Sequence, residues 1–152
     1  MGTSAPARPH VSLPVRLHVA PVAYALGAAM LVGEAAVHVQ QYAALFHEIR
    51  WIGPLFLANA VACLACVAAL ALPRTRKLAA LAGIVTSAIA LGSLVVSYGQ
   101  GLFGWQEAGF RPIVELTVIF EFAAVVLLSA ALAAVITPTA RAVTAARAPN
   151  PL

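Results

Sequence analysis

Charged residues are scarce in this sequence of 152 residues, of which 9% are charged and 62% hydrophobic, with a mean hydropathy of +0.95. Water-soluble domains contain about 25% charged and only about 45–50% apolar residues. With so few charges, a soluble protein could not cover its own surface. A lipid bilayer must therefore be the solvent for most of the chain, and its length leaves room for one domain.

A basic stripe interleaved with aromatic side chains, the usual mark of a nucleic-acid-binding surface, is also missing. The formal net charge is +4, but the Lys and Arg residues stand at the ends of apolar segments. Charges in that position set the orientation of a membrane protein. We therefore expect no nucleic acid among the partners of this protein.

Only two cysteines are present, Cys63 and Cys66, and both fall inside an apolar run. On a helix this spacing places them on one face, about a turn apart. Such a pair holds a metal or acts in redox chemistry in some proteins. Buried cysteine also serves as a small apolar side chain, and for an isolated pair in an alanine-rich segment we favour that packing role.

Four apolar stretches each have the roughly 20 residues that a helix needs to cross the ~30 Å hydrocarbon core. A cleaved signal peptide is the alternative for the first stretch, but this stretch is long for one and Glu34 interrupts it. The segments 1–17 and 137–152 are polar and contain proline. The sequence therefore predicts an all-α fold, an integral membrane bundle of four transmembrane helices flanked by two tails, with spans at 18–41, 52–72, 78–98 and 113–136.

The Lys and Arg residues are divided unevenly between the two ends of these predicted helices. Seven of the nine lie in the two tails and the 73–77 connection, against Arg50 and Arg111 in the other two connections. Cytoplasmic segments carry the excess of positive charge. We therefore predict that the N- and C-termini are both cytoplasmic, and that Trp51 and Trp105 belong to an aromatic belt on the outer side.

Three carboxylates lie within the predicted spans, those of Glu34, Glu115 and Glu121. Ionisable groups in a spanning helix are costly, and by default they mark a functional site. At a rise of 1.5 Å per residue, Glu34 and Asn59 lie about 10 Å below the outer ends of their helices. Ser93 and Glu121 lie about 8 Å and about 12 Å below theirs. All four helices thus offer a polar side chain at nearly one level.

A second tier of polar groups lies above this level. His38 follows Glu34 by four residues, so the two side chains share a helix face and can touch. Carboxylates beside an imidazole suit zinc, iron or copper(II). The same groups could relay protons or bind an amine. The spacing is not that of the zinc protease motif, and no helix carries a His pair at i and i+4.

Structural roles compete with these functional ones. Glu34 and His38 could be a hydrogen-bonded pair that fixes two helices together. Glu115 follows Pro112 in the first turn of the fourth predicted helix, where a carboxylate stabilises the positive end of the helix dipole. The 99–112 connection is too apolar for a simple exposed loop, and we expect it to lie over the site as a flap.

Short motifs cluster near the outer ends of the predicted helices. They are His38, Ile52-Gly-Pro-Leu-Phe-Leu, the stretch from Tyr98 through Gly-Leu-Phe-Gly to Glu107, and a fourth span that carries Glu115 and Glu121. On these residues the chain resembles a group of small four-helix bacterial membrane proteins. The resemblance implies a four-span bundle in a bacterial cytoplasmic (plasma) membrane, and no particular reaction.

The first functional hypothesis is a binding protein rather than an enzyme, one that takes up a cation, metal or small ligand for transport, sensing or delivery. Its predicted ligand-binding residues are Glu34, His38, Asn59, Ser93, Glu115 and Glu121. A divalent metal is the possible cofactor, with Glu34, His38 and Glu121 as its ligands. Apart from the lipid bilayer, the expected partners are further copies of the chain or a larger membrane protein, because four short helices enclose little volume.

Two other hypotheses come from different classes of function. One is an accessory or structural subunit of a larger membrane complex, in which the polar residues only fix helix packing. The other is a membrane-embedded oxidoreductase that uses haem or quinone. The second is less favoured, because of the four histidines only His38 lies within a span at the side of the polar layer.

Overall fold

The computed structural model describes residues 16–109 and 111–136, and this part of the chain is almost entirely helical. The prediction of an all-α four-helix bundle is confirmed. The elements in chain order are α1 (Arg16–Ala44), the short 3-10 helix η1 (Phe46–Glu48), α2 (Ile52–Ala71), α3 (Arg76–Gly99) and α4 (Pro112–Ile136).

The observed helices are close to the predicted spans, and three of them are longer. The largest difference is in α1, which extends three residues beyond Gln41, to Ala44. The three added residues, Tyr42, Ala43 and Ala44, follow the polar pair Gln40 and Gln41 and continue the helix. The predicted tails 1–17 and 137–152 lie outside the described residues, except for Arg16 and Leu17, which belong to α1.

All four long helices are long and apolar enough to cross a membrane. Their candidate spans contain 20 to 26 residues, with mean hydropathies between 1.6 and 2.5. Twenty helical residues extend about 30 Å, which matches the hydrocarbon thickness. Large apolar side chains remain exposed on the outward faces, among them Val61, Ile89 and Ile119. The protein is thus a multi-pass membrane protein whose surface is in contact with lipid.

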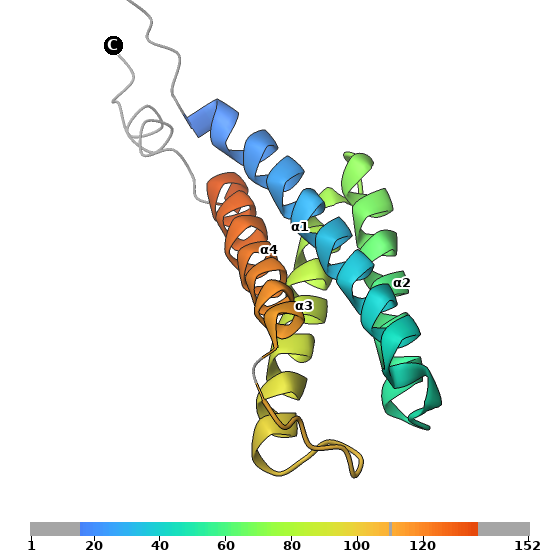
Figure 1. Ribbon diagram of the computed structural model, residues 1–152. Coiled ribbons are helices and arrows are strands. Elements are labelled where there is room, and N and C mark those ends of the chain that lie inside the picture. The colour runs from blue at the N-terminus through green and yellow to red at the C-terminus, as the bar shows by residue number, and fades with distance from the viewer. Residues whose placement is uncertain (1–15, 110, 137–152) are drawn as a thin grey trace, which may run out of the picture.

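The helices form a ring in which each one packs against two neighbours. The contact between α1 and α4 is the most extensive, and Figure 1 shows these two helices side by side. The contact between α2 and α3 is the least extensive of the four. The start of α1, the α2–α3 connection and the end of α4 lie at one end of the bundle (Figure 1). This end is called the basic end below, because Arg74 lies in the connection and Arg76 and Lys77 begin α3.

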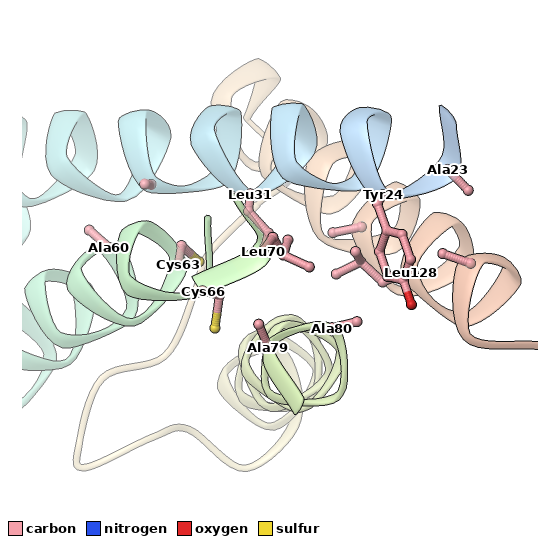
Figure 2. Packing of buried hydrophobic residues seen from close by; sticks show 13 residues of the cluster. Ala23, Tyr24, Leu31, Ala60, Cys63, Cys66, Leu70, Ala79, Ala80 and Leu128 are labelled. Carbon is pink, nitrogen blue, oxygen red and sulfur yellow. The ribbon is translucent and has the colours of Figure 1, made fainter. Parts of the chain in front are cut away.

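The half of the bundle nearer the basic end has an apolar core. Leu31 of α1 and Leu128 of α4 are fully buried there, among small side chains of α2 and α3 (Figure 2). A Cβ atom at Gly27 or Gly83 would lie 2.5 or 2.9 Å from the nearest side-chain atom of Leu128. Small residues at such contacts let membrane helices approach closely. This half of the bundle is therefore closed by packing alone.

The opposite end is closed by the chain segment around η1. Gly53, in the first turn of α2, approaches the backbone of this segment so closely that a Cβ atom would lie 2.5 Å from the carbonyl oxygen of Phe46. Phe46 is itself buried. The absence of a side chain at residue 53 thus sets the angle between α2 and the preceding turn.

Replacing Gly53 by alanine is expected to destabilise the bundle by about 1–3 kcal/mol, the usual effect of overpacking at a site that cannot expand. Thermal unfolding of the purified protein in detergent measures this as a lower midpoint. The matched control is Gly92→Ala in α3, where an added Cβ has no neighbour within 4 Å. Equal midpoints for the two variants would show that the close approach is not a constraint.

Candidate functional site

The carboxylate of Glu34 lies at the centre of the bundle, fully buried, and is bonded to two other helices. Asn59 of α2 donates from Nδ2 to Glu34 Oε1 at 2.8 Å. Ser87 of α3 donates from its hydroxyl to Oε2 at 2.6 Å. A buried polar group is costly unless it is hydrogen-bonded. Both carboxylate oxygens are satisfied, so α1, α2 and α3 are held at a fixed register around this one side chain.

The imidazole of His38 is oriented by the same turn of α1. Its Nδ1 lies 2.9 Å from the backbone carbonyl oxygen of Glu34. A carbonyl can only accept a hydrogen bond, so in this contact Nδ1 carries the proton and Nε2 presents its lone pair. Histidine ligands of metals are commonly oriented in this way, by donating the other ring N–H to a carbonyl. The geometry leaves Nε2 available as a ligand.

Glu121 of α4 completes the group from the opposite side. Its Oε1 lies 3.7 Å from His38 Nε2, and the residue is 1% exposed. Its Oε2 is buried and has no hydrogen-bond partner in the described part of the chain. Within residues 16–109 and 111–136, no Lys or Arg forms an ion pair with Glu34 or Glu121. Two carboxylates therefore share one buried volume without a protein cation to compensate them.

These three residues form a group that could hold a metal ion. One ligand atom each from Glu34, His38 and Glu121 can be chosen so that all three lie within 4.8 Å of one another, and all three residues are buried. Ligand atoms around one ion lie closer still, at bond lengths of about 2.0–2.2 Å. Ion binding would therefore draw the three side chains inward. One imidazole and two carboxylates are a donor set suited to a divalent first-row metal.

A second polar contact joins α1 and α4 nearer the end of the bundle that carries η1. Gln41 donates from Nε2 to the hydroxyl of Thr117 at 3.0 Å, and Thr117 donates in turn to the carbonyl oxygen of Ile113 at 2.8 Å. Both side chains are buried. This chain of hydrogen bonds lies between the Glu34–His38–Glu121 group and the η1 end of the bundle, and it fixes α4 against α1 about one helical turn from the carboxylates.

A cavity of about 310 Å³ adjoins the group. His38, Asn59 and Glu121 line its inner wall, and residues of α2 and α3 form its sides. Leu55 and Ile89, which also line it, are 46% and 63% exposed on the lipid-facing surface. The cavity therefore reaches the outside between α2 and α3, the pair of neighbouring helices with the least extensive contact.

The loop after α3 forms the outer wall of this cavity, as expected of a flap. Leu102, Trp105 and Glu107 all line it. The Trp105 ring meets the Phe46 ring edge-on at 5.5 Å, and Phe46 stacks on Phe56 at 4.5 Å. Phe56 in turn lies 5.0 Å from the His38 ring. A continuous aromatic contact thus connects the loop to the imidazole.

The structure brings together four of the six residues predicted as ligand-binding: Glu34, His38 and Glu121, with Asn59 bonded to Glu34. Ser93 lines the cavity, whereas the hydroxyl that reaches Glu34 from α3 is that of Ser87. Glu115 is exposed in the first turn of α4 and does not line the cavity. This position fits the helix-dipole role considered for it.

Ser87 recurs four residues after Gly83 in a row of small residues, a spacing that suits helix packing, so the sequence did not single it out as a site residue. A hydroxyl in such a row can serve packing and hydrogen bonding together. Trp105 was assigned only to the interfacial belt. Its indole Nε1 is buried and has no hydrogen-bond partner among the described residues, which the sequence does not reveal.

The two cysteines belong to the apolar core rather than to the polar group. Both are reduced and buried, and they pack with Leu70 and Ala79 (Figure 2). The Sγ atom of Cys63 lies 3.7 Å from Asn59 Nδ2. Neither cysteine is part of the three-residue group whose ligand atoms converge. The packing role favoured from the sequence is consistent with this placement.

The hydrogen bonds to Glu34 predict that Ser87→Ala destabilises the bundle by about 1–2 kcal/mol, since it removes a donor to a buried carboxylate. The measurement is the unfolding midpoint in detergent. Ser93→Ala, on the same helix, removes a hydroxyl that only lines the cavity, and we expect it to be close to neutral. A larger loss for Ser93→Ala than for Ser87→Ala would contradict the assignment.

Comparison with protein-family models, with curated proteins and with solved structures finds no match. The resemblance to small four-helix membrane proteins extends to the four long apolar helices, and no family is identified. The function must therefore be inferred from the geometry of the residues themselves. That geometry shows a four-span membrane protein with a buried Glu34–His38–Glu121 group that could bind a metal.

Proposed function

We propose that this protein binds a divalent transition-metal ion within the membrane, with Glu34, His38 and Glu121 as its ligands. The observation that carries the proposal is the convergence of three buried ligand atoms from two helices, with Glu121 Oε2 left unpaired in the described structure. Two carboxylates buried without a protein cation are costly in hydrocarbon. A bound divalent cation supplies the missing positive charge.

The donor set narrows the choice of ion. Calcium and magnesium prefer oxygen ligands only, whereas imidazole suits zinc, copper, iron and nickel. Glu34 is already oriented by Asn59 and Ser87, and His38 by a backbone carbonyl. Such supporting hydrogen bonds are typical of metal ligands. Zinc(II) is the simplest probe of the site, because it has no redox chemistry and binds nitrogen and oxygen donors readily.

The distribution of Lys and Arg supports an outer-leaflet position for the site, with both termini in the cytoplasm. The cavity then gives the ion or its carrier a way in from the outer half of the bilayer. Transport, sensing and delivery are the roles such a site serves. A second copy or a larger membrane protein is the expected partner, because four short helices enclose little volume.

Zinc stoichiometry of the full-length protein tests the proposal. The protein is purified in detergent, stripped with chelator, reloaded with Zn²⁺ and analysed for metal content. One zinc ion per chain is expected for the wild type. Glu121→Gln and His38→Gln each remove a ligand and should lower the affinity at least about 100-fold, beyond the usual effect of losing a supporting group.

Glu115→Gln is the matched control, because it removes an exposed carboxylate from the same helix as Glu121. It should bind zinc as the wild type does. Glu121→Gln is expected to fold normally, since the lost oxygen had no hydrogen-bond donor in the described structure. Unchanged zinc content in Glu121→Gln, or none in the wild type, would overturn the metal proposal.

Zinc affinity is also expected to fall as the pH is lowered. Metal ligands must be deprotonated, so protons compete with the ion for the imidazole and the two carboxylates. Titration of the reloaded protein at decreasing pH, followed by metal analysis of the protein fraction, measures the effect. An affinity independent of pH would contradict a site made of these three residues.

A packing role for the same residues is the second candidate, and a specific observation favours it. Glu34 joins three helices through Asn59 and Ser87 whether or not an ion is bound. An accessory subunit held together by this contact would bind no zinc, and Glu121→Gln, which removes an oxygen without a hydrogen-bond donor in the described structure, would preserve its assembly. An absorption spectrum of the same preparation tests the oxidoreductase alternative, since bound haem gives a Soret band.

A further inference from the structure

The basic end of the bundle carries positive charge that no acidic side chain of the protein balances. Arg74, Arg76 and Lys77 stand in or beside the α2–α3 connection. The whole sequence has five acidic residues, and all of them lie elsewhere: in the central group, in η1, in the loop after α3 or in the first turn of α4. They are Glu34, Glu48, Glu107, Glu115 and Glu121. An anion from outside the chain is the natural counter-charge.

A pocket of about 260 Å³ lies at this end. It is formed by three helices and the connection between α2 and α3. Its polar lining comes from Tyr24, Arg76 and Lys77, and its apolar lining from Ala20, Pro21, Pro73 and Val135. Two cationic side chains beside an apolar wall suit an amphiphilic anion. The cations can bind its charged headgroup, and the wall can contact its apolar part.

Tyr24 supplies an independent reason to expect a ligand. Its side chain points from α1 into the bundle and is only 7% exposed (Figure 2). Its hydroxyl group is buried and has no hydrogen-bond partner within residues 16–109 and 111–136. Buried hydroxyl groups normally have a partner, and each exception requires an explanation. A ligand oxygen that accepts from this hydroxyl provides one.

Arg76 is held beside the ring of Tyr24. Its Nε donates to the carbonyl oxygen of Leu70 at 2.9 Å, and its guanidinium carbon lies 5.7 Å from the Tyr24 ring centroid. The hydrogen bond to Leu70 fixes the Arg76 side chain in place, so this side chain loses little conformational freedom when a ligand binds. A planar guanidinium with further N–H donors matches a phosphate group in geometry and charge.

The N-terminus of α3 adds the positive partial charge of a helix dipole to the pocket. Arg76 is the first residue of this 24-residue helix, and the preceding residue, Thr75, makes no side-chain cap. The first amide N–H groups of a helix have no partner within it, and they carry the positive end of the helix dipole. Phosphate groups are commonly bound at such positions.

We propose that this pocket binds a phosphate group, recognised by Arg76, Lys77, the hydroxyl of Tyr24 and the start of α3. A lipid headgroup and a free phosphate compound share this chemistry. The membrane position of the pocket and its apolar wall favour the lipid. Basic pockets between helices on the cytoplasmic side of membrane proteins hold anionic headgroups, and the charge distribution predicts that this end is cytoplasmic.

Stabilisation by added ligand tests the proposal. The full-length protein is purified in a neutral, phosphate-free detergent, and its unfolding midpoint is measured with phosphatidylglycerol, with diacylglycerol or with inorganic phosphate. Phosphatidylglycerol should raise the midpoint and diacylglycerol, which lacks the phosphate, should not. A rise with inorganic phosphate alone would assign the site to free phosphate compounds. No rise with either phosphate-bearing ligand would overturn the proposal.

Variants connect the effect to the pocket. Arg76→Gln should weaken phosphatidylglycerol binding at least about fivefold, the usual contribution of one basic residue at an anionic surface. Arg50→Gln is the matched control, because Arg50 is exposed at the opposite end and stacks on Trp51. An equal loss in the two variants would indicate nonspecific charge attraction and contradict the site.

Tyr24→Phe keeps the test valid if Arg76→Gln fails to fold. Without ligand it should be as stable as the wild type or more so, since it removes only an unpaired buried hydroxyl. With phosphatidylglycerol its midpoint should rise less than that of the wild type. An equal rise would remove Tyr24 from the site. These measurements use no metal, so their outcome is independent of the zinc experiment.

Discussion

The buried carboxylate of Glu34 is the group on which the half of this bundle nearer η1 depends. It accepts hydrogen bonds from Asn59 of α2 and Ser87 of α3, while the backbone carbonyl of the same residue orients His38. Three helices and one imidazole are thus placed by a single residue. In a bilayer, where apolar contact between helices has little directional preference, such hydrogen bonds fix which faces meet. The unpaired oxygen of Glu121 then faces a group already held in position.

The molecule has an electrostatic polarity along its axis. The carboxylates lie in the centre and toward the end that carries η1, and Arg74 of the α2–α3 connection lies at the other end with Arg76 and Lys77 of α3. Between them is an apolar core built around Leu31 and Leu128. This separation keeps Glu34 and Glu121 away from Arg76 and Lys77, so neither set neutralises the other. The proposed cation site in the centre of the bundle and the proposed anion site at the basic end are therefore separate.

The sequence predicted the four helices well, because long apolar runs leave little choice of structure in lipid. It also predicted from helical rise that Glu34, Asn59 and Glu121 share nearly one level. It did not distinguish Ser87 from Ser93. Spanning helices are apolar on every face, so periodicity does not show which face points inward. In addition, α1 continues to Ala44, which places Glu34 about 15 Å from the C-terminal end of this helix rather than about 10 Å. The cavity and the buried groups without a hydrogen-bond partner in the described structure, such as Glu121 Oε2, could not be predicted from the sequence, because they arise from packing between segments far apart in the chain.

The most direct test of the central metal site is X-ray absorption spectroscopy on the zinc-loaded wild-type protein. Ligation by Glu34, His38 and Glu121 predicts a first shell of nitrogen and oxygen atoms at about 2.0–2.2 Å, with the outer-shell pattern of one imidazole. Cys63 and Cys66 lie close by in the core and offer the competing donor atoms. A sulfur shell at about 2.3 Å would place the ion on these cysteines and contradict the carboxylate–histidine site.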